Sequence, residues 1–396
     1  MHRSTVTALA LFTASAAGRR CINQTVPVDI SARQAVFDLD IPQTNLEVTD
    51  FVLNVTQQGR NFTDTVLIGY NTTSGTYNIS TQFCMPDSSN VTNPTVQVLT
   101  HGIGFDKTSY CTLSFDRLGV GNSSHGEPLN EIQAFREIAA TAQLTQMLCN
   151  GTFPGVNQTF SKVVHVGHSF GSAQTYSLAN LYPELTDGII LTGFSMNASF
   201  VPFFAAGANF QLVNRNQPLR YSNITGQQVQ TLLSMYAEPL VDYIAPIDLT
   251  TITTPQMLPN GYLVSSNAEV NKYLFFKPKF YDAGILTLAE ATKQPVTLGE
   301  LLTLGSLVTM NNFNGPVMVI TGDYDLPYCG SDCLATGGAA ASIPAMVKMN
   351  FPNVADSNFS AIIQLNTGHG INFHYNVTGA YTVMNDFLGA KGLASS

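Results

Sequence analysis

The sequence predicts an α/β fold with a mostly parallel, doubly wound sheet, a β-rich entry near the amino terminus and an inserted lid. Two observations predict this class. Short apolar runs with strand character alternate with segments of helical spacing up to residue 194, and the alternation resumes after residue 305. Such alternation is typical of parallel strands with helices on both faces of the sheet. Between these stretches the pattern breaks down into helix-like and irregular pieces with many prolines and aromatics.

The β-rich entry extends from Gln34 to Pro86. It contains three segments rich in β-branched and aromatic residues, with loop residues between them, which favours strands. These segments are Val48–Gln57, Phe62–Asn71 and Thr76–Met85.

The elements of the core follow from apolar runs and helical spacing. The expected strands are Val96–Thr100, Lys162–Val166, Gly188–Thr192, Pro316–Thr321 and Ala361–Leu365, and the expected helices are Asn130–Leu148, Gly171–Leu185 and Val377–Leu388. We therefore expect a core of residues 18–194 and 306–396 with a lid of residues 195–305. Two independent tandem domains are the alternative that 396 residues also allow.

The first residues are typical of a secretory signal peptide. His2 and Arg3 precede an apolar run from Thr5 to Ala17 that ends in small residues. We expect residues 1–17 to be removed, so that the mature chain begins near Gly18. A short buried helix is the alternative, since the run is too short to span a bilayer. No later segment predicts a stable membrane anchor.

The composition indicates a globular, secreted glycoprotein. Apolar residues make up 44% of the chain, which excludes disorder as the main state. Charged residues are only 11%, with a net charge of −9, so no basic stripe for nucleic acid is expected. Asn-x-Ser/Thr sites are abundant and predict surface glycans. They lie at Asn23, Asn54, Asn61, Asn71, Asn78, Asn90, Asn122, Asn150, Asn157, Asn197, Asn223, Asn358 and Asn376.

Six cysteines in an oxidising route suggest disulfides. They are Cys21, Cys84, Cys111, Cys149, Cys329 and Cys333, which allow fifteen pairings if all are used. Cys329 with Cys333 is the one pair that we favour. Metal binding by this pair is the alternative, but no second ligand pair has zinc spacing.

The central chemical feature is a strand that runs into Gly167-His168-Ser169-Phe170-Gly171, with helix-compatible residues after it. A serine nucleophile must stand clear of the backbone and needs a base to remove its proton. A sharp strand-to-helix turn with flanking glycines meets the first need. We predict Ser169 as the nucleophile; a structural Gly/Ser turn is the alternative.

With this motif the sequence resembles the α/β-hydrolase family, from about Thr95 to the end of the chain. The family's order is nucleophile, acid, histidine, so the partners of Ser169 are sought downstream. His369 follows the predicted strand Ala361–Leu365 and resembles the family's catalytic histidine. His374 is its rival. For the acid, the resemblance favours Asp325, three residues beyond Gly322, over Asp323.

Other uses of these carboxylates fit less well. A calcium loop with Asp323, Asp325 and Asp332 lacks the required glycine and terminal glutamate. The triad would let Asp325 orient the imidazole and stabilise the imidazolium that forms when Ser169 gives up its proton. We expect no cofactor and no metal.

The resemblance also predicts an oxyanion hole, the set of donors that stabilises the developing negative charge. One donor is the backbone N–H of Phe170, directly after the nucleophile. The other comes from the loop His101-Gly102-Ile103-Gly104, where Ile103 is the first choice and Gly104 the second. His101 itself is expected to be a packed residue that shapes this loop.

A last match is the stretch Asp116–Ser123, which is similar to a glycine-containing turn in many capped members of the family. Asp116 and Arg117 are expected to bond locally and to brace the oxyanion loop. A phosphate-binding loop is the alternative, but no Lys-Ser/Thr follows.

The resemblance implies a serine hydrolase that cleaves an ester or related acyl bond of an apolar small molecule. An acyltransferase, or a lyase or cyclase in natural-product biosynthesis, uses the same residues and is the second hypothesis. A non-catalytic binding protein is the third. Serine at the turn disfavours an epoxide or haloalkane hydrolase. The substrate, the oligomeric state and the cysteine pairing stay open.

Overall fold

The computed structural model describes residues 19–86, 95–105, 113–222, 256–306 and 308–394. An eight-stranded sheet lies at its centre, in the order β1-β2-β4-β3-β5-β6-β10-β11. Its strands are β1 Arg19–Phe37, β2 Leu67–Pro86, β3 Thr95–Thr100, β4 Leu113–Phe115, β5 Lys162–His168, β6 Gly188–Thr192, β10 Val317–Tyr324 and β11 Phe359–Gly368. β2 pairs antiparallel with β1 and β4, and all other neighbours pair parallel. The predicted α/β class is confirmed.

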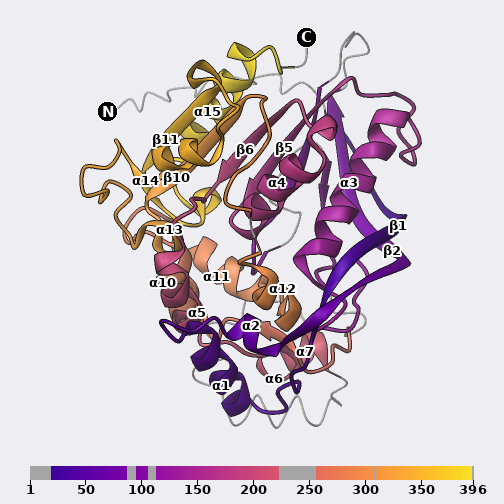
Figure 1. Ribbon diagram of the computed structural model, residues 1–396, viewed down its shortest axis with the longest axis vertical. Helices are drawn as coiled ribbons and strands as arrows, with labels where there is room; N and C mark the ends of the chain where they lie inside the picture. The colour runs from indigo at the N-terminus through magenta and orange to yellow at the C-terminus, as the bar shows by residue number, and fades with distance from the viewer. Residues whose placement is uncertain (1–18, 87–94, 106–112, 223–255, 307, 395–396) are drawn as a thin grey trace, which may run out of the picture.

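Helices cover both faces of the sheet (Figure 1). Successive residues of one strand point to opposite faces, so each face has its own core. On one face, α4 (Phe170–Leu181) packs on Ile189, Leu191, Val317 and Val319. On the other, α15 (Val377–Ala390) packs on Ile190, Met318 and Ile320. α3 (Ala134–Asn150) lies beside α4 and also packs against β1. The doubly wound arrangement is therefore confirmed.

The β-rich entry is only partly as predicted. β1 and β2 form one long hairpin, but the residues between them form α1 (Asn45–Thr56) and α2 (Phe62–Val66). The expected strand over Val48–Gln57 is therefore wrong, and in the strand expected over Phe62–Asn71 only the part from Leu67 onward is a strand. Val48, Phe51 and Val52 are buried at helical spacing, and the Thr44 side chain accepts a hydrogen bond from the Glu47 N–H as an N-cap. Burial of this apolar face and the cap outweigh the strand preference of the β-branched residues.

The described residues of the range 195–305 lie in the lower half of Figure 1, and we call them the cap. Its helices are α5 Val201–Gly207, α6 Val213–Asn216, α7 Pro218–Tyr221, α10 Ala268–Phe275, α11 Ala283–Thr292 and α12 Leu298–Thr303. A three-stranded antiparallel sheet was not predicted; it consists of β7 Gln211–Leu212, β8 Tyr262–Val264 and β9 Val296–Thr297. α1 packs against α5 and β7, so the amino-terminal helices belong to the cap as well.

Short helices complete the carboxyl-terminal half: α13 Leu326–Cys329 and α14 Ile343–Met346. Single 3₁₀ turns lie at Pro183–Leu185, Ala198–Phe200, Val347–Asn350, Asp356–Asn358 and Ile371–Phe373. Within the described ranges, no helix is long and apolar enough to cross a membrane. The predicted signal peptide lies outside the described residues.

Two disulfides join cysteines within the described residues. Cys329 is joined to Cys333, as favoured from the sequence, and Cys21 is joined to Cys84 across the β1–β2 hairpin. Cys149 is not in a disulfide with any described residue, and Cys111 lies outside the described residues.

A buried histidine in β5 predicts an acid-sensitive core. The His165 side chain is fully buried, its Nε2 lies 2.9 Å from the Thr145 Oγ1, and burial lowers its pKa to about 3. In the unfolded chain the imidazole of His165 takes up a proton near pH 6.5, whereas in the folded protein it stays neutral down to about pH 3. The full stability of the fold is therefore present above about pH 6.5 and is lost progressively as the pH falls toward the pKa of the folded state. In His165→Gln, the free energy of unfolding should depend less steeply on pH between 6 and 4, by about 1.4 kcal/mol per pH unit.

Denaturant titrations at several pH values in this range measure how steeply the free energy of unfolding changes with pH. Thr145→Val removes the same hydrogen bond without removing a titrating group, so it should keep the wild-type slope. Equal slopes for His165→Gln and the wild type would contradict the prediction.

Candidate active site

The turn between β5 and α4 carries Ser169 in a strained backbone conformation, with φ 54° and ψ −118°. Glycines make this turn possible. A Cβ on Gly171 would lie 2.1 Å from the Thr100 carbonyl oxygen, and one on Gly167 would lie 2.4 Å from the Gly171 carbonyl oxygen. A strained residue at a strand-to-helix turn is typical of a nucleophile whose side chain must be exposed. Ser169 is partly exposed, whereas its neighbours His168 and Phe170 are buried.

The three residues predicted for the triad lie in one chain of hydrogen bonds. The His369 Nε2 is 2.8 Å from the Ser169 Oγ, and the His369 Nδ1 is 2.7 Å from the Asp325 Oδ2. Asp325 and His369 are fully buried. In this order the carboxylate accepts from Nδ1–H, which leaves Nε2 free to accept the serine proton.

Asp325 is fixed from several sides. It lies directly after β10, where its Oδ1 accepts from the Tyr328 N–H at 3.0 Å as the N-cap of α13. Its carbonyl oxygen accepts from the Ser331 N–H at 2.8 Å, and the Cys329–Cys333 disulfide closes the same loop. The carboxylate therefore has one oxygen held by the backbone and the other turned toward His369.

The rival acid, Asp323, has other partners. Its Oδ2 lies 2.6 Å from the Nζ of Lys277, a cap residue, and its Oδ1 accepts from the Thr367 N–H at 3.0 Å. Asp323 therefore holds the loop before His369 and contacts the cap, and no hydrogen bond joins it to His369 among the described residues.

The rival base, His374, is also occupied. Its Nε2 accepts from two backbone N–H groups, those of Lys277 at 2.9 Å and Gly368 at 3.1 Å. Its Nδ1 must then carry the proton and donate to the Gly370 carbonyl oxygen at 2.9 Å. Burial is the main cause that lowers the pKa of His374, which keeps it neutral. His374 therefore joins the histidine loop to the cap.

Aromatic rings surround the imidazole of His369. Phe275 stacks on it at 5.9 Å between ring centroids, Tyr328 lies at 5.8 Å and Phe204 at 6.2 Å. The ring of His168 is 5.1 Å away, and burial together with His369 lowers the pKa of His168 well below its usual range. Apart from this neutral histidine, the rings offer apolar surface beside the nucleophile.

The predicted oxyanion loop packs against the nucleophile. A Cβ on Gly102 would lie 2.9 Å from the Ser169 Cβ and 3.1 Å from the His168 carbonyl oxygen. Phe170 is the first residue of α4, so its N–H has no acceptor within the helix. Gly104 has φ +89°, and its carbonyl oxygen accepts from the Gln294 N–H of the cap at 3.0 Å. The roles of Ile103, Gly104 and Phe170 as donors stay predictions.

The tight packing of Gly102 predicts a strong effect of a single methyl group. In Gly102→Ala, the new Cβ has to displace either the oxyanion loop or the turn at Ser169, which misplaces the reacting groups. We expect kcat for ester hydrolysis to fall about 100-fold, since a misplacement of about 1 Å costs this much. Steady-state kinetics with a p-nitrophenyl ester measures the change.

Gly389→Ala is the matched control, because a Cβ there meets nothing within 4 Å and its φ is not positive. It should leave kcat and KM unchanged. If Gly102→Ala were as active as this control, the predicted placement of the loop would be wrong.

Several residues around the site have no signal in the local sequence. Lys277 of the cap and Gln294, which holds Gly104, could not be found from motifs. Glu300 could have been found in part: Thr297-Leu298-Gly299-Glu300 fits a capping box, and both of its hydrogen bonds are present. Among the described residues, no group of three or more His, Cys, Asp and Glu side chains could hold a metal ion.

No protein-family model matches this chain, and no curated protein sequence does. The solved structures that resemble it in shape include two hydrolases. An esterase from Thermogutta terrifontis has a TM-score of 0.42 and 13% identity over 80% of this chain and 95% of its own. An epoxide hydrolase from Vigna radiata has a TM-score of 0.41 and 15% identity over 80% and 94%. Both matches are remote, so the function proposed below rests on the residues of this chain alone.

Proposed function

We propose that this chain is a secreted serine hydrolase that cleaves an ester bond of an apolar small molecule through an acyl-enzyme. The hydrogen-bond chain from Asp325 through His369 to Ser169 is the observation that carries the proposal. Three such groups, in this order and at these distances, are what activates a serine hydroxyl.

In the first half of the reaction, the Ser169 Oγ attacks the ester carbonyl while its proton passes to the His369 Nε2. The imidazolium formed is stabilised by the buried carboxylate of Asp325. The negative charge on the carbonyl oxygen is taken up by the N–H groups of Phe170 and Ile103. His369 then gives its proton to the leaving alcohol, which departs and leaves an ester on Ser169.

In the second half, water attacks this ester while its proton passes to the His369 Nε2. The tetrahedral intermediate collapses, the acid leaves and the proton returns to Ser169. An alcohol or amine in place of water gives acyl transfer. The aromatic rings around the imidazole are the observation that keeps acyl transfer as a second candidate, because an apolar shell lowers the access of water.

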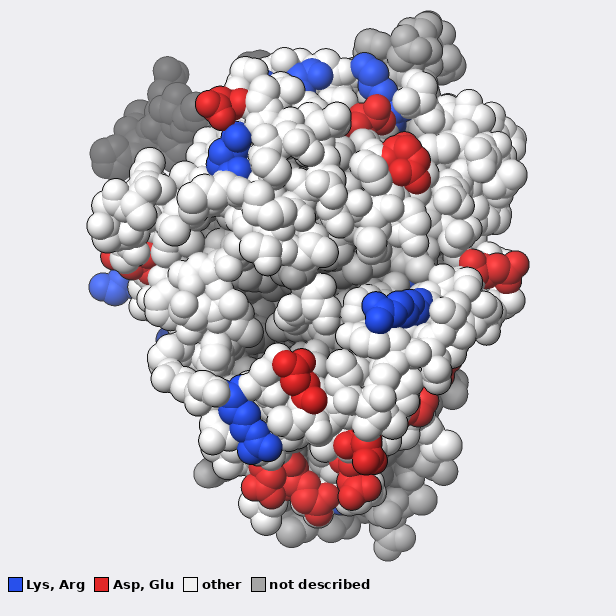
Figure 2. Space-filling model, in the orientation of Figure 1, with Lys and Arg blue, Asp and Glu red and all other residues white. Residues whose placement is uncertain are grey.

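The substrate class follows from the surroundings of the site. Phe204, Phe275 and Tyr328 line the imidazole. The face shown in Figure 2 has few charged groups and a hollow near its middle. Such a setting suits an apolar acyl or alkyl group.

Secretion and glycosylation are part of the proposal. None of the eleven sequon asparagines within the described residues is buried; Asn90 and Asn223 lie outside them. The two disulfides fit an oxidising compartment.

Expression in a eukaryotic secretory host should therefore give protein in the medium whose mass falls on enzymatic deglycosylation. Intracellular retention without a change in mass would contradict this part.

A fluorophosphonate probe tests the nucleophile. It should modify the purified protein once per chain, and peptide mapping should place the label on Ser169. Labelling of another residue, or none, would overturn the proposal.

A series of p-nitrophenyl esters of increasing acyl length, with and without an alcohol acceptor, tests the reaction. Release of free acid supports hydrolysis. A new ester that forms in preference to acid would replace hydrolysis by acyl transfer on the same site, and no turnover of any ester despite labelling would overturn ester hydrolysis.

A further inference from the structure

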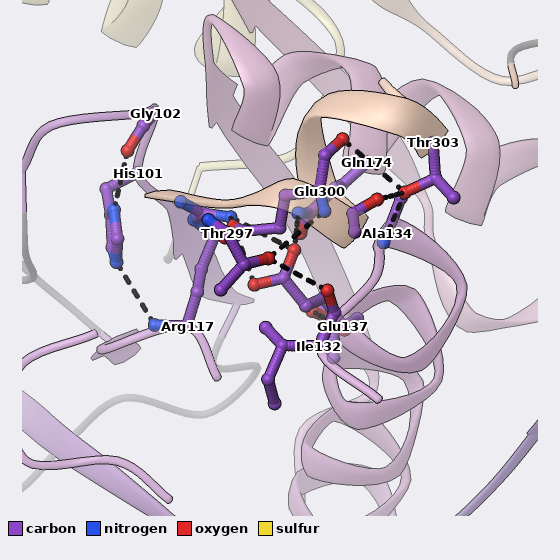
Figure 3. Close-up of polar contacts among 12 residues, drawn as sticks. His101, Gly102, Arg117, Ile132, Ala134, Glu137, Gln174, Thr297, Glu300 and Thr303 are labelled. Atoms are coloured by element: carbon purple, nitrogen blue, oxygen red, sulfur yellow. Dashed lines mark hydrogen bonds and ion pairs between the residues drawn. The ribbon is translucent and has the colours of Figure 1, made fainter. Parts of the chain in front are cut away.

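A fully buried charge cluster lies behind the predicted oxyanion loop (Figure 3). Arg117 follows β4, Glu137 lies near the start of α3, and Glu300 lies on α12 of the cap. The Nη1 of Arg117 is 3.0 Å from both carboxylate oxygens of Glu137 and 2.5 Å from the Oε1 of Glu300. The side-chain exposure of these residues is 0–1%.

The charges in this cluster do not balance if every group is ionised. One guanidinium faces two carboxylates, and both carboxylates crowd onto the same nitrogen, while the Nε and Nη2 of Arg117 have no hydrogen-bond partner among the described residues. An uncompensated buried carboxylate is costly, and two carboxylates that share a buried site favour the state in which one of them is protonated. The arrangement therefore favours one proton on the pair.

The surroundings indicate where this proton sits. The oxygens of Glu300 both accept, from Arg117 and from the Thr297 N–H at 2.7 Å in the capping box. The Oε2 of Glu137 lies 2.5 Å from the amide of Gln174, whose oxygen has no partner among the described residues. With the amide turned over, a protonated Glu137 donates to that oxygen at a distance typical of O–H···O bonds. Burial, the main cause, raises the pKa of Glu137 well above its usual range.

Arg117 also contacts both segments that carry the predicted oxyanion donors. Its backbone N–H donates to the His101 Nε2 at 3.1 Å, and the His101 Nδ1–H donates to the Gly102 carbonyl oxygen at 2.9 Å, which fixes the loop before Ile103 (Figure 3). Its guanidinium carbon lies 4.8 Å from the centroid of the Phe170 ring, within the range of a cation–π contact. One residue thus contacts both segments that flank the nucleophile.

The cluster also joins the cap to the core. Besides the contact of Glu300 with Arg117, the Thr297 Oγ1 donates to the Ile132 carbonyl oxygen at 2.9 Å, and the Thr303 Oγ1 accepts from the Ala134 N–H at 3.1 Å. These bonds place α12 on the start of α3. The position of Arg117 therefore depends on a cap residue.

We propose that Arg117 is a positioning residue for the oxyanion hole, and that Glu137 and Glu300 hold it as a pair that carries one proton. The first part rests on the proposed function, because it assigns the oxyanion hole of that same site. The second part concerns charge balance and can be tested without any activity.

Arg117→Met tests the positioning role. The backbone N–H that bonds His101 is kept, but the guanidinium and its contacts with the Phe170 ring and the two carboxylates are lost. We expect kcat to fall about 10- to 100-fold, less than for the loss of a donor itself, while KM changes less than about 3-fold. A trifluoromethyl ketone that adds to Ser169 forms an oxyanion, so its inhibition constant should rise by the same factor as kcat falls. If KM rises and kcat stays unchanged, the positioning role is wrong.

Arg136→Met is the matched control. Arg136 is also a buried arginine of this region, but it contacts Thr73, Glu131 and Tyr77 and not the oxyanion loop. It should leave kcat and the inhibition constant near the wild-type values; an equal loss in both variants would overturn the proposal. If Arg117→Met does not fold, Arg117→Lys provides the test, with a smaller fall in kcat because the charge stays and the planar stack on Phe170 is lost.

Glutamine variants test the shared proton. Glu137→Gln replaces a protonated carboxyl by a neutral amide, so the thermal midpoint should stay within about 2 °C of the wild type. The double variant Glu137→Gln with Glu300→Gln leaves the guanidinium without a counter-charge and should lower the midpoint by roughly 5–10 °C. A fall of more than about 5 °C for Glu137→Gln alone would contradict a protonated Glu137.

These readouts separate the two proposals. A wild-type protein that neither reacts with the fluorophosphonate nor hydrolyses any ester overturns the proposed function. The thermal midpoints of the glutamine variants then still decide whether Glu137 and Glu300 share a proton. A reactive wild type with unchanged kinetics in Arg117→Met overturns the positioning role alone.

Discussion

Ser169→Ala should lower kcat for ester hydrolysis by about 10⁶-fold and abolish labelling by the fluorophosphonate. The hydroxyl is the atom that forms the acyl-enzyme, and removal of the nucleophile of a serine triad has an effect of this size. The fold should be unaffected, because within the described part of the chain the Ser169 Oγ is hydrogen-bonded to His369 alone, and alanine fits the same turn. Residual turnover under saturating substrate measures the loss.

Ser172→Ala is the matched control for this variant. Ser172 lies one turn further along α4, is fully buried, and donates from its Oγ to the Thr192 carbonyl oxygen at 2.8 Å. Its replacement should lower stability by about 1 kcal/mol with kcat nearly unchanged. Full activity of Ser169→Ala would remove Ser169 from the mechanism.

Asp325→Asn should lower kcat by about 10⁴-fold. An amide at this position donates rather than accepts toward the His369 Nδ1, so the imidazole takes the tautomer in which Nε2 carries the proton and cannot accept from Ser169. This loss is typical when the triad carboxylate becomes an amide. The effect should appear in kcat, with KM little changed, since Asp325 is buried behind the imidazole.

Asp323→Asn is the comparison that decides between the two aspartates. It weakens the ion pair with Lys277 and keeps an oxygen for the Thr367 N–H, so we expect a fall in kcat of about 10-fold or less. A larger effect of Asp323→Asn than of Asp325→Asn would assign the acid to Asp323.

The sequence predicted those elements whose signal is local. The strands around Gly188–Thr192 and Val317–Tyr324 are apolar runs between loop residues, and the strained turn at Ser169 needs glycines that stand beside it in the sequence. The order of the three triad residues came from the resemblance. The distances between the three side chains could not be predicted from the sequence. They depend on the parallel pairing of β5, β6, β10 and β11, which brings the ends of these strands together in space.

The parts that could not be predicted depend on tertiary contacts. α1 has β-branched residues and became a helix because its apolar face is covered by the cap. Lys277, Gln294 and Glu300 are ordinary residues in the sequence, and each acquires its role from a loop of the core that lies more than forty positions away. The same holds for the bond that His374 accepts from Lys277, 97 positions away, whereas the bond from Gly368 is local.

The place of α1 in the cap has a consequence for biosynthesis. α1 ends at Thr56, but the helix α5 against which it packs starts only at Val201. At ordinary rates of translation, the apolar face of α1 waits roughly 10–30 s for its partner. During that time the nascent amino-terminal segment has to be kept from aggregation, and the sequons at Asn54 and Asn61 lie on this segment, where early attached sugars would shield it.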